Sequence, residues 1–422
     1  MIRFLFKGVL RDPSRSVFPL IAIVTGVAMV IAMKGVMLGV MDDMIRSYAV
    51  LDTGHIKVVT QSYAEMADIF PIDLGLTDVD SLIGELSESN ESMFFTPRIR
   101  FGGLVDIPDE DGETKAQSPA AFMAVDLLSP GSRQIELLNL EQGIVSGSLP
   151  DQPDEILVTD ELAGKLGIGP GDIATFVGTT MFGSMTTYNF HVAGTVVFGI
   201  SAIDKGFVII DIEGARDALD MTDSATEILG FFNDMIYAEK PSLETCKKFN
   251  ELQDEDEFAP LMMNLRDQNN FGLILDRTAW MTGLIAAIFI GLVAIVLWNS
   301  GLMSGLKRHG EIGIRLAMGE TKRHVYNSLL IESLMLGVFG TIIGTAIGLA
   351  LVYYLQEVGL NYQESMEGLT LMMSNVMRGK VTTDLYFIGI LPGIVATLIG
   401  TAIAGRAIYK REMSRLFKEL EA

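Results

Sequence analysis

The stretch 278–306 reads TAWMTGLIAAIFIGLVAIVLWNSGLMSGL and contains no charged residue. A helix needs about 20 apolar residues to cross a hydrocarbon core of about 30 Å, because it rises about 1.5 Å per residue. This stretch is therefore long enough to span a membrane. Working outward, three more such runs occur, at 16–41 with Lys34 as its one charge, at 325–355 with Glu332 as its one charge, and at 385–405 with none. The sequence thus predicts four transmembrane helices, one before and three after a long polar segment.

The first of these runs has a signal peptide as its alternative interpretation. A signal peptide has an apolar core of roughly 7–15 residues followed by a small-residue cleavage site. The run at 16–41 is longer, no A-x-A sequence follows it, and Asp42 and Asp43 come next. An uncleaved first span is therefore favoured.

Charge is divided unevenly along the chain and predicts its orientation. The net charge is −22, yet residues 42–277 hold 14 Lys+Arg and 42 Asp+Glu, which leaves a net charge of −28 there and +6 elsewhere. The basic segments 1–15, 307–324 and 406–422 fall on one side of a four-span chain, and basic flanks mark the cytoplasmic side. We therefore expect cytoplasmic termini and an extracytoplasmic domain at 42–277. Such acidity argues against nucleic-acid binding, which needs a surplus of Lys and Arg.

The segments outside the spans have their own patterns. Residues 1–15 begin with basic residues at every fourth position, which indicates an amphipathic cytoplasmic helix, although an ordinary charged flank remains the alternative. Residues 356–384 are a short external loop. The external domain is large enough for two subdomains and reads as α+β. β-rich runs predict strands at 54–59, 95–105, 120–127, 155–159, 172–178, 189–198 and 206–211, and helices are expected at 161–168, 213–219 and 242–253.

Motifs for catalysis, cofactors and metals are missing from the sequence. There is no G-x-x-x-x-G-K-[ST] loop and no H-E-x-x-H, and the four His are scattered. The single Cys246 excludes an internal disulfide or a Cys-rich metal site. We therefore expect a chain that is not an enzyme, with no catalytic, cofactor-binding or metal-ligating residues of its own.

The segment after the second span carries the most specific pattern. It reads KRHGEIGIRLAMGETKRHVYNSLLIESLMLGVFGTIIGTAIG over 307–348, a short amphipathic helix followed by a basic start to the third span. This resembles the R-x-x-E-I-G-I-x-R-A-x-G-A segment of the MacB/FtsX-like ABC transporter permeases, the family that includes the lipoprotein-releasing Lol permeases. The matching positions here are Arg308, Glu311, Ile312, Gly313, Ile314, Arg315 and Gly319, with Glu320 where the family has Ala.

Further matches lie in the external domain. Residues 155–172 are similar to the strand, L-A-x-x-L-G helix and G-D turn of the MacB-type periplasmic core, and 190–199 to its F-x-V-x-G-I-V strand. Residues 52–63, DTGHIKVVTQSY, resemble the start of that domain in Lol-like members. The resemblance covers essentially the whole chain. It implies a helical membrane protein with one span, a MacB-type α+β periplasmic domain and three further spans, in the bacterial inner membrane.

The resemblance also implies partners and a mechanism. Two permease subunits, identical or different, would pair above two separate ABC ATPase subunits that bind ATP and Mg²⁺. ATP binding would close the permease pair and pass motion to the external domains, with the segment around 308–320 coupling to the ATPase. Within it, Glu311, Arg315 and Gly319 are the first choices for the contact.

Residues within the spans receive more local interpretations. Small residues spaced four apart let helices approach closely, so Gly340, Gly344 and Gly348 are assigned to packing, and Glu332 to a hydrogen bond between helices rather than to a proton relay. Lys34 either reaches the interface by snorkelling or contacts substrate or lipid. Methionine is pliable, so a Met-rich surface would suit a lipid-like cargo, although plain packing is the alternative; the residues concerned are Met29, Met33, Met37 and Met281.

Three functions within the family remain open. A permease that extracts lipoproteins from the outer leaflet of the inner membrane, together with a periplasmic chaperone, is the leading interpretation. An exporter of peptides or drugs that works with a periplasmic adaptor is the second. The third is a transmembrane regulator of a cell-wall hydrolase, for which the external domain is larger than usual.

Overall fold

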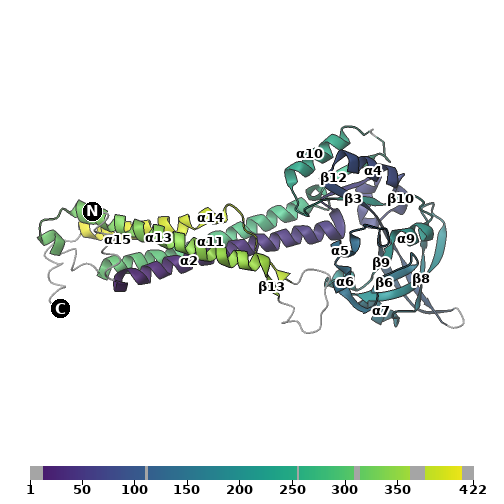
Figure 1. The fold of residues 1–422 in the computed structure, drawn as a ribbon, viewed down its shortest axis with the longest axis horizontal. Coiled ribbons are helices and arrows are strands. Elements are labelled where there is room, and N and C mark those ends of the chain that lie inside the picture. The colour runs from purple at the N-terminus through teal and green to yellow at the C-terminus, as the bar shows by residue number, and fades with distance from the viewer. Residues whose placement is uncertain (1–12, 110–112, 254–255, 308–313, 362–375, 411–422) are drawn as a thin grey trace. The chain divides into compact units, whose positions relative to one another are not determined.

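The computed structural model describes residues 13–109, 113–253, 256–307, 314–361 and 376–410 (Figure 1). These residues form two compact units. One contains 13–42, 276–361 and 376–410, and the other contains 43–275. The expected amphipathic helix at the N-terminus lies almost wholly outside the described residues.

The first unit consists of long apolar helices, as the sequence predicts. They are α2 (Pro13–Tyr48), α11 (Phe271–Lys307), α13 (Lys322–Glu357) and a fourth made of α14 (Leu385–Ile388), η6 (Leu391–Ala396) and α15 (Thr397–Lys410). Four helices of the described chain are long and apolar enough to cross a membrane, within Val17–Thr53, Phe271–Val296, Lys322–Glu357 and Leu385–Ile403. The fold class of one N-terminal and three C-terminal spans is therefore confirmed.

Two details of the spans differ from the sequence-based bounds. α2 and α11 extend beyond the apolar runs, to Tyr48 at one end and from Phe271 at the other, because polar residues at the end of a long helix do not break it. The fourth span is not a regular α-helix, since η6 is a π-helical turn that contains Pro392. Proline has no N–H to donate, so the helix loses one hydrogen bond there and its ladder is locally rearranged.

Glycines bring α13 into close contact with α2. A Cβ atom built on Gly340 would lie 2.5 Å from Ile23 Cγ2, and one on Gly348 would lie 2.9 Å from Ile31 Cβ. At Gly344 the nearest atom would be the Val24 carbonyl oxygen, at 2.8 Å.

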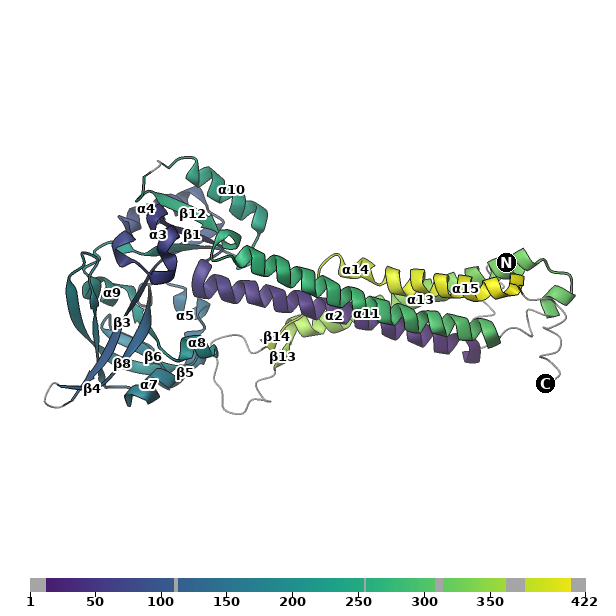
Figure 2. The same ribbon diagram turned by 180° about the vertical axis from the view of Figure 1, so that it is seen from behind.

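In both views α2 and α11 lie side by side (Figures 1 and 2). The core shared by these helices contains Ile23, Val27, Ile31, Leu349, Val352 and Leu385, with Val293 of α11 packed against it.

We expect Gly344→Val to disrupt the contact between α2 and α13. Its Cβ would meet a backbone oxygen that cannot turn aside, so the change should lower the free energy of unfolding by about 1–3 kcal/mol. SDS titration of the purified chain in mixed micelles, followed by the fluorescence of Trp280 and Trp298, measures this loss. Ala346→Val places the same side chain at an exposed position of α13 and should be neutral. Equal stability of the two variants would contradict the packing role of Gly344.

The second unit is a mixed α+β domain built on one ten-stranded sheet. The strand order is β12-β1-β11-β3-β4-β9-β6-β8-β5, with β7 pairing to β3 and β8. Most neighbours are antiparallel, whereas β4 with β9 and β6 with β8 are parallel. The strands are β1 (Ile56–Thr60), β3 (Met93–Pro108), β4 (Thr114–Val125), β5 (Ile144–Gly147), β6 (Glu155–Thr159), β7 (Ile173–Thr179), β8 (Met185–Val196), β9 (Phe207–Asp211), β11 (Glu227–Phe232) and β12 (Pro260–Asn264).

Short elements accompany this sheet. Two pairs of short strands are β2 (Leu76–Thr77) with β10 (Ser224–Ala225), and β13 (Leu360–Asn361) with β14 (Val376–Met377), the latter pair lying outside this unit. The helices are α3 (Gln61–Met66), α4 (Val79–Ser89), α5 (Gln134–Leu137), α6 (Leu140–Gly143), α7 (Asp160–Leu166), α8 (Ser201–Asp204), α9 (Ile212–Leu219) and α10 (Glu239–Asn250). Single turns add η1 (Ala49–Thr53), η2 (Ala67–Ile69), η3 (Ile72–Leu74) and η4 (Leu265–Asp267).

One long strand joins the two ends of this sheet. β3 pairs with β11 over Met93–Arg98 and with β7 over Leu104–Asp106. This strand therefore runs through both regions of the unit formed by 43–275. The seven predicted strands are present, while the sequence analysis missed β5, β11 and β12. The last two place the site described next.

Candidate functional site: the end of the first helix and the external sheet

The described part of the expected coupling segment is short and amphipathic. Residues 314–317 form one helical turn, which ends at Gly319 with a φ of +96°. Leu316 is buried against Val325 of α13, whereas Ile314 and Met318 are 55% and 72% exposed. An apolar pair is therefore left on the surface of this turn.

Arg315, on the same turn, forms an ion pair within the chain. Its Nε lies 3.1 Å from Glu320 Oε2, and Glu320 is the residue that departs from the family pattern. The remaining coupling residues, Arg308, Glu311, Ile312 and Gly313, lie outside the described residues.

The other sequence-predicted residues lie along the membrane helices. Met29 of α2 and Met281 of α11 are each 51% exposed. Met33, Lys34 and Met37 of α2 and Glu332 of α13 are half-buried. Next to Glu332, Ser333 Oγ donates a hydrogen bond to the Thr397 carbonyl oxygen at 3.2 Å, so α13 and the fourth span share a polar contact at this level.

A polar site that the sequence analysis missed lies where α2 ends, in the unit formed by 43–275. The sequence predicts an external position for this unit, and it is called the external unit below. The helix continues through the π-helical turn η1 and stops at Gly54, whose φ is +63°. Arg98 of β3 is 1% exposed, and its guanidinium donates to the carbonyl oxygens of Val50 and Leu51, each at 3.0 Å. The last carbonyls of a helix lack partners within it and carry the negative end of its dipole. Arg98 therefore ties the end of the first helix to the sheet.

The next residue, Asp52, joins this anchor to a buried network of charges. Its carboxylate accepts a short hydrogen bond from Arg100 and one of 2.9 Å from Asn269 Nδ2, and it lies 3.5 Å from Lys57 Nζ. Glu227 of β11 is 1% exposed and lies 2.6 Å from Lys57 Nζ and 3.9 Å from Arg100 Nε. Three cations and two anions, counting Arg98, are thus held together.

Strand register explains why these side chains meet. Arg98 and Arg100 are two residues apart on β3 and therefore point to the same face of the sheet. Glu227 lies directly opposite Arg98, and Lys57 of β1 lies opposite Leu229, two residues further along β11. The three neighbouring strands β1, β11 and β3 accordingly direct their charges to one face.

The mutual pairing decides how these groups ionise. The ion pairs with Lys57 and Arg100 favour the charged form of the Asp52 carboxylate. Burial lowers the pKa of Arg98 to about 10, against the opposing effect of Glu227. The carboxylate and the guanidinium both remain charged at neutral pH, so the network is ionic.

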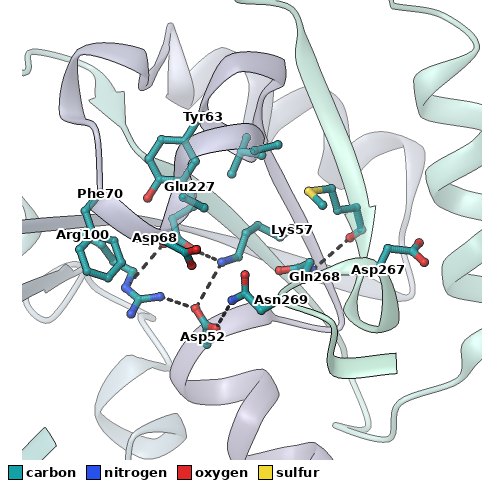
Figure 3. Close-up of a pocket in the computed structure, with 14 residues that line it drawn as sticks. Asp52, Lys57, Tyr63, Asp68, Phe70, Arg100, Glu227, Asp267, Gln268 and Asn269 are labelled. Carbon is teal, nitrogen blue, oxygen red and sulfur yellow. Dashed lines mark hydrogen bonds and ion pairs between the residues drawn. The ribbon is translucent and has the colours of Figure 1, made fainter. Parts of the chain in front are cut away.

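The start of α11 closes the other side of the site. Gln268 Nε2 donates to the Thr53 carbonyl oxygen at 3.2 Å, and the rings of Tyr48 and Phe271 stack with centroids 3.9 Å apart. Beside the network is a pocket of about 260 Å³ (Figure 3). It is lined by Asp52, Lys57, Val59, Tyr63, Ala64, Ala67, Asp68, Phe70, Arg100, Glu227, Met263, Asp267, Gln268 and Asn269. The end of α2, the start of α11, the sheet and the pocket are therefore adjacent.

Residues 283–413 match the family described as "FtsX-like permease C-terminal". This part of the chain is therefore similar to the C-terminal part of FtsX-like permeases. The chain is 25% identical over 276 residues to a lipoprotein-releasing system transmembrane protein LolC of Xylella fastidiosa (strain Temecula1), which covers 63% of this chain and 64% of that protein. It is 33% identical over 93 residues to a macrolide export ATP-binding/permease protein MacB of Hyphomonas neptunium, which covers 22% of this chain and 13% of that protein.

One solved structure shows a weak likeness to this chain. The periplasmic region of MacB from Actinobacillus actinomycetemcomitans superimposes with a TM-score of 0.35 at 11% identity, covering 52% of this chain and 94% of that one. The alignment to LolC spans just under two thirds of the length of that relative.

A signal for the buried network was present in the sequence. Lys57 lies inside an apolar strand, and Arg98 and Arg100 alternate with apolar residues in PRIRFGG. Charges within strands that are otherwise apolar are rarely buried unless they are paired. What the sequence could not supply was the partner, because Glu227 is more than 120 residues away from both arginines.

His55, next to this network, gives the external unit a dependence on acid. It is fully buried, its Nδ1 accepts a hydrogen bond from Phe232 N at 3.0 Å, and burial lowers its pKa from 6.5 to about 4. Unfolding returns the pKa to about 6.5. The contribution of His55 to the free energy of unfolding is therefore constant above that pH and falls as the pH drops from about 6.5 to 4. The loss is on the order of 3 kcal/mol.

Urea unfolding of the full chain in micelles, followed by protease resistance of the external unit, measures this loss. His55→Asn keeps an acceptor near Phe232 N but does not titrate, so it should remove this part of the acid slope. His191→Gln, at a half-exposed histidine, should keep the slope. If His55→Asn retained the full slope, the assignment to His55 would be wrong.

Proposed function

We propose that the chain is the membrane subunit of an ABC transporter that extracts lipoproteins, or another lipidated cargo, from the outer leaflet of the bacterial inner membrane. A separate ATPase subunit would supply the energy, and a second permease subunit, identical or different, would complete the complex. The observation that carries this proposal is the 276-residue alignment to a protein named for lipoprotein release. That alignment is longer than the match at 283–413, so the likeness extends into the external segment.

The geometry at the end of α2 supports transmission of motion rather than conduction through a pore. α2 and α11 are continuous helices whose inner parts belong to the helical unit and whose outer ends belong to the external unit. Arg98 holds the last carbonyls of the first, and Gln268, just before the second, bonds to Thr53. A displacement of either helix along its axis would therefore be passed to the sheet through hydrogen bonds to buried groups.

The exposed apolar turn of the coupling segment supports an ATPase partner. Ile314 and Met318 lie on its surface beside Arg315, a combination that suits a groove on a soluble protein. In this proposal the segment and both termini are cytoplasmic and the acidic unit is periplasmic. Met29 and Met281, each half-exposed on its helix, are the candidates for contact with acyl chains, with Lys34 as the candidate for a headgroup.

Co-purification of cargo tests the proposal. The tagged chain is purified with its ATPase from inner membranes and analysed for triacylated peptides by mass spectrometry, before and after ATP is added. We expect lipoprotein to be bound without nucleotide and released with ATP and Mg²⁺. A preparation that hydrolyses ATP but never contains acylated protein would overturn the cargo assignment.

Export through a periplasmic adaptor is the second candidate. It is favoured by the short matches of 33–38% identity to proteins named for macrolide or pyoverdine export, which cover 16–25% of this chain. These matches have higher identity than LolC but much smaller coverage. Capture of a periplasmic adaptor, with no acylated protein, would favour this function.

A further inference from the structure

The pocket beside the charge network has an excess of hydrogen-bond acceptors. Its lining includes four carboxylates and two cations. Lys57 and Arg100 are already engaged by Asp52 and Glu227. The remaining two, Asp68 and Asp267, are exposed and take part in none of the ion pairs found among the described residues. The pocket therefore has a surplus of negative charge near its opening.

A buried amide group beside the pocket also has an unused hydrogen-bond acceptor. Gln268 is 4% exposed, and its Nε2 bonds to backbone oxygens, while its Oε1 has no hydrogen-bond partner. Figure 3 shows this oxygen turned toward the group of Lys57, Asp52 and Asn269. An unpartnered buried carbonyl is destabilising, and a ligand with an N–H donor would supply the missing hydrogen bond.

The walls and the size limit the ligand further. The Arg100 guanidinium carbon lies 4.5 Å from the centroid of the Phe70 ring, and Tyr63 of α3 is buried. One water occupies about 30 Å³, so a cavity of about 260 Å³ has room for a molecule of several heavy atoms. No cluster of three or more His, Cys, Asp or Glu suited to a metal occurs in the described part of the chain.

We propose that this pocket binds a primary ammonium group on a short polar chain. The ammonium supplies the N–H donors that Gln268 Oε1 lacks and the positive charge that Asp68 and Asp267 favour. A quaternary ammonium carries the charge without the donors and should bind poorly. Either a free amine or the headgroup of an aminophospholipid has this chemistry. The inference does not depend on the transported cargo.

Thermal unfolding of the full-length chain tests the site. In lipid-free micelles, ethanolamine is compared with choline and with sodium chloride at equal concentration. In nanodiscs, phosphatidylcholine alone is compared with a mixture containing phosphatidylethanolamine. A free-amine ligand predicts a saturable rise in melting temperature with ethanolamine only. A lipid ligand predicts a rise with phosphatidylethanolamine and none with soluble ethanolamine.

Two variants localise the effect. Asp68→Asn removes charge at the rim, and Ala64→Leu fills the pocket without removing any hydrogen bond of the network. Each should weaken the apparent affinity at least 10-fold. Asp73→Asn and Ala202→Leu make the same changes at exposed positions outside the pocket. These two variants should bind as the wild-type chain does. The proposal is overturned if neither amine source stabilises the chain, if choline acts as well as ethanolamine, or if the pocket variants bind like wild type.

Discussion

Replacing Arg98 with methionine is expected to lower the free energy of unfolding of the external unit by about 3–5 kcal/mol. Methionine fills a similar volume but leaves the carbonyls of Val50 and Leu51 without donors and removes one of three cations facing two buried anions. Each buried carbonyl that loses its donor costs about 1–3 kcal/mol, so the two carbonyls together account for a loss of this size. Urea titration of the full chain, read by protease resistance of the external unit, gives the value.

The control for Arg98→Met is Lys247→Met. Lys247 is 78% exposed, and its ion pair among the described residues is with Glu251, directly after the same helix; exposed pairs contribute about 0–1 kcal/mol. A second reading separates anchoring from general stability. If Arg98 holds the end of α2, hydrogen exchange in 49–53 should accelerate in Arg98→Met even well below the unfolding transition. If hydrogen exchange in 49–53 matched that of the wild-type chain, Arg98 would not anchor the end of α2.

Reversing the charge of Arg315 is the second change with a large expected effect. In the proposed complex this residue contacts the ATPase, so Arg315→Glu should reduce ATPase binding and ATP-driven cargo release more than 10-fold while membrane insertion is unchanged. A pull-down of the ATPase on the tagged chain and a release assay in proteoliposomes measure the two effects. Normal activity in Arg315→Glu would exclude a coupling role for this residue.

The ion pair between Arg315 and Glu320 provides a matched control. Glu320→Gln breaks the pair but leaves Arg315 in place, so coupling should persist. The exchange Arg315→Glu/Glu320→Arg restores an ion pair with the charges reversed. If Arg315 only stabilises the turn, the exchange should regain activity. Because we expect a direct contact with the ATPase, it should remain inactive.

The membrane architecture could be predicted because it depends on local composition. A span needs only enough consecutive apolar residues, and the basic flanks of 307–324 and the acidic segment 42–277 are visible in the sequence itself. The glycine spacing in the third span likewise indicated a close helix contact, and the structure places Gly340, Gly344 and Gly348 against α2. Strands rich in β-branched residues were found for the same reason.

The buried network could not be predicted because its members are joined only by pairing of distant strands. Lys57, Arg98 and Glu227 come from β1, β3 and β11, and the sequence analysis missed β11 altogether. No residue near Glu227 in the sequence indicates the cation with which it forms an ion pair. Similarly, the length of β3 became important only when its two ends were seen to pair with different strands, β11 and β7.

The sequence by itself thus determined that the chain has four spans, which segment is acidic, and where a short amphipathic turn follows the second span. Each of these properties is a sum over neighbouring residues. Only the tertiary structure decided that Arg98 binds the last carbonyls of α2, that Glu227 lies beside Lys57, and that Gln268 Oε1 is left unpartnered beside a pocket. These properties depend on strand register and on burial, which set the distances between groups far apart in the chain and remove the water that would otherwise satisfy them.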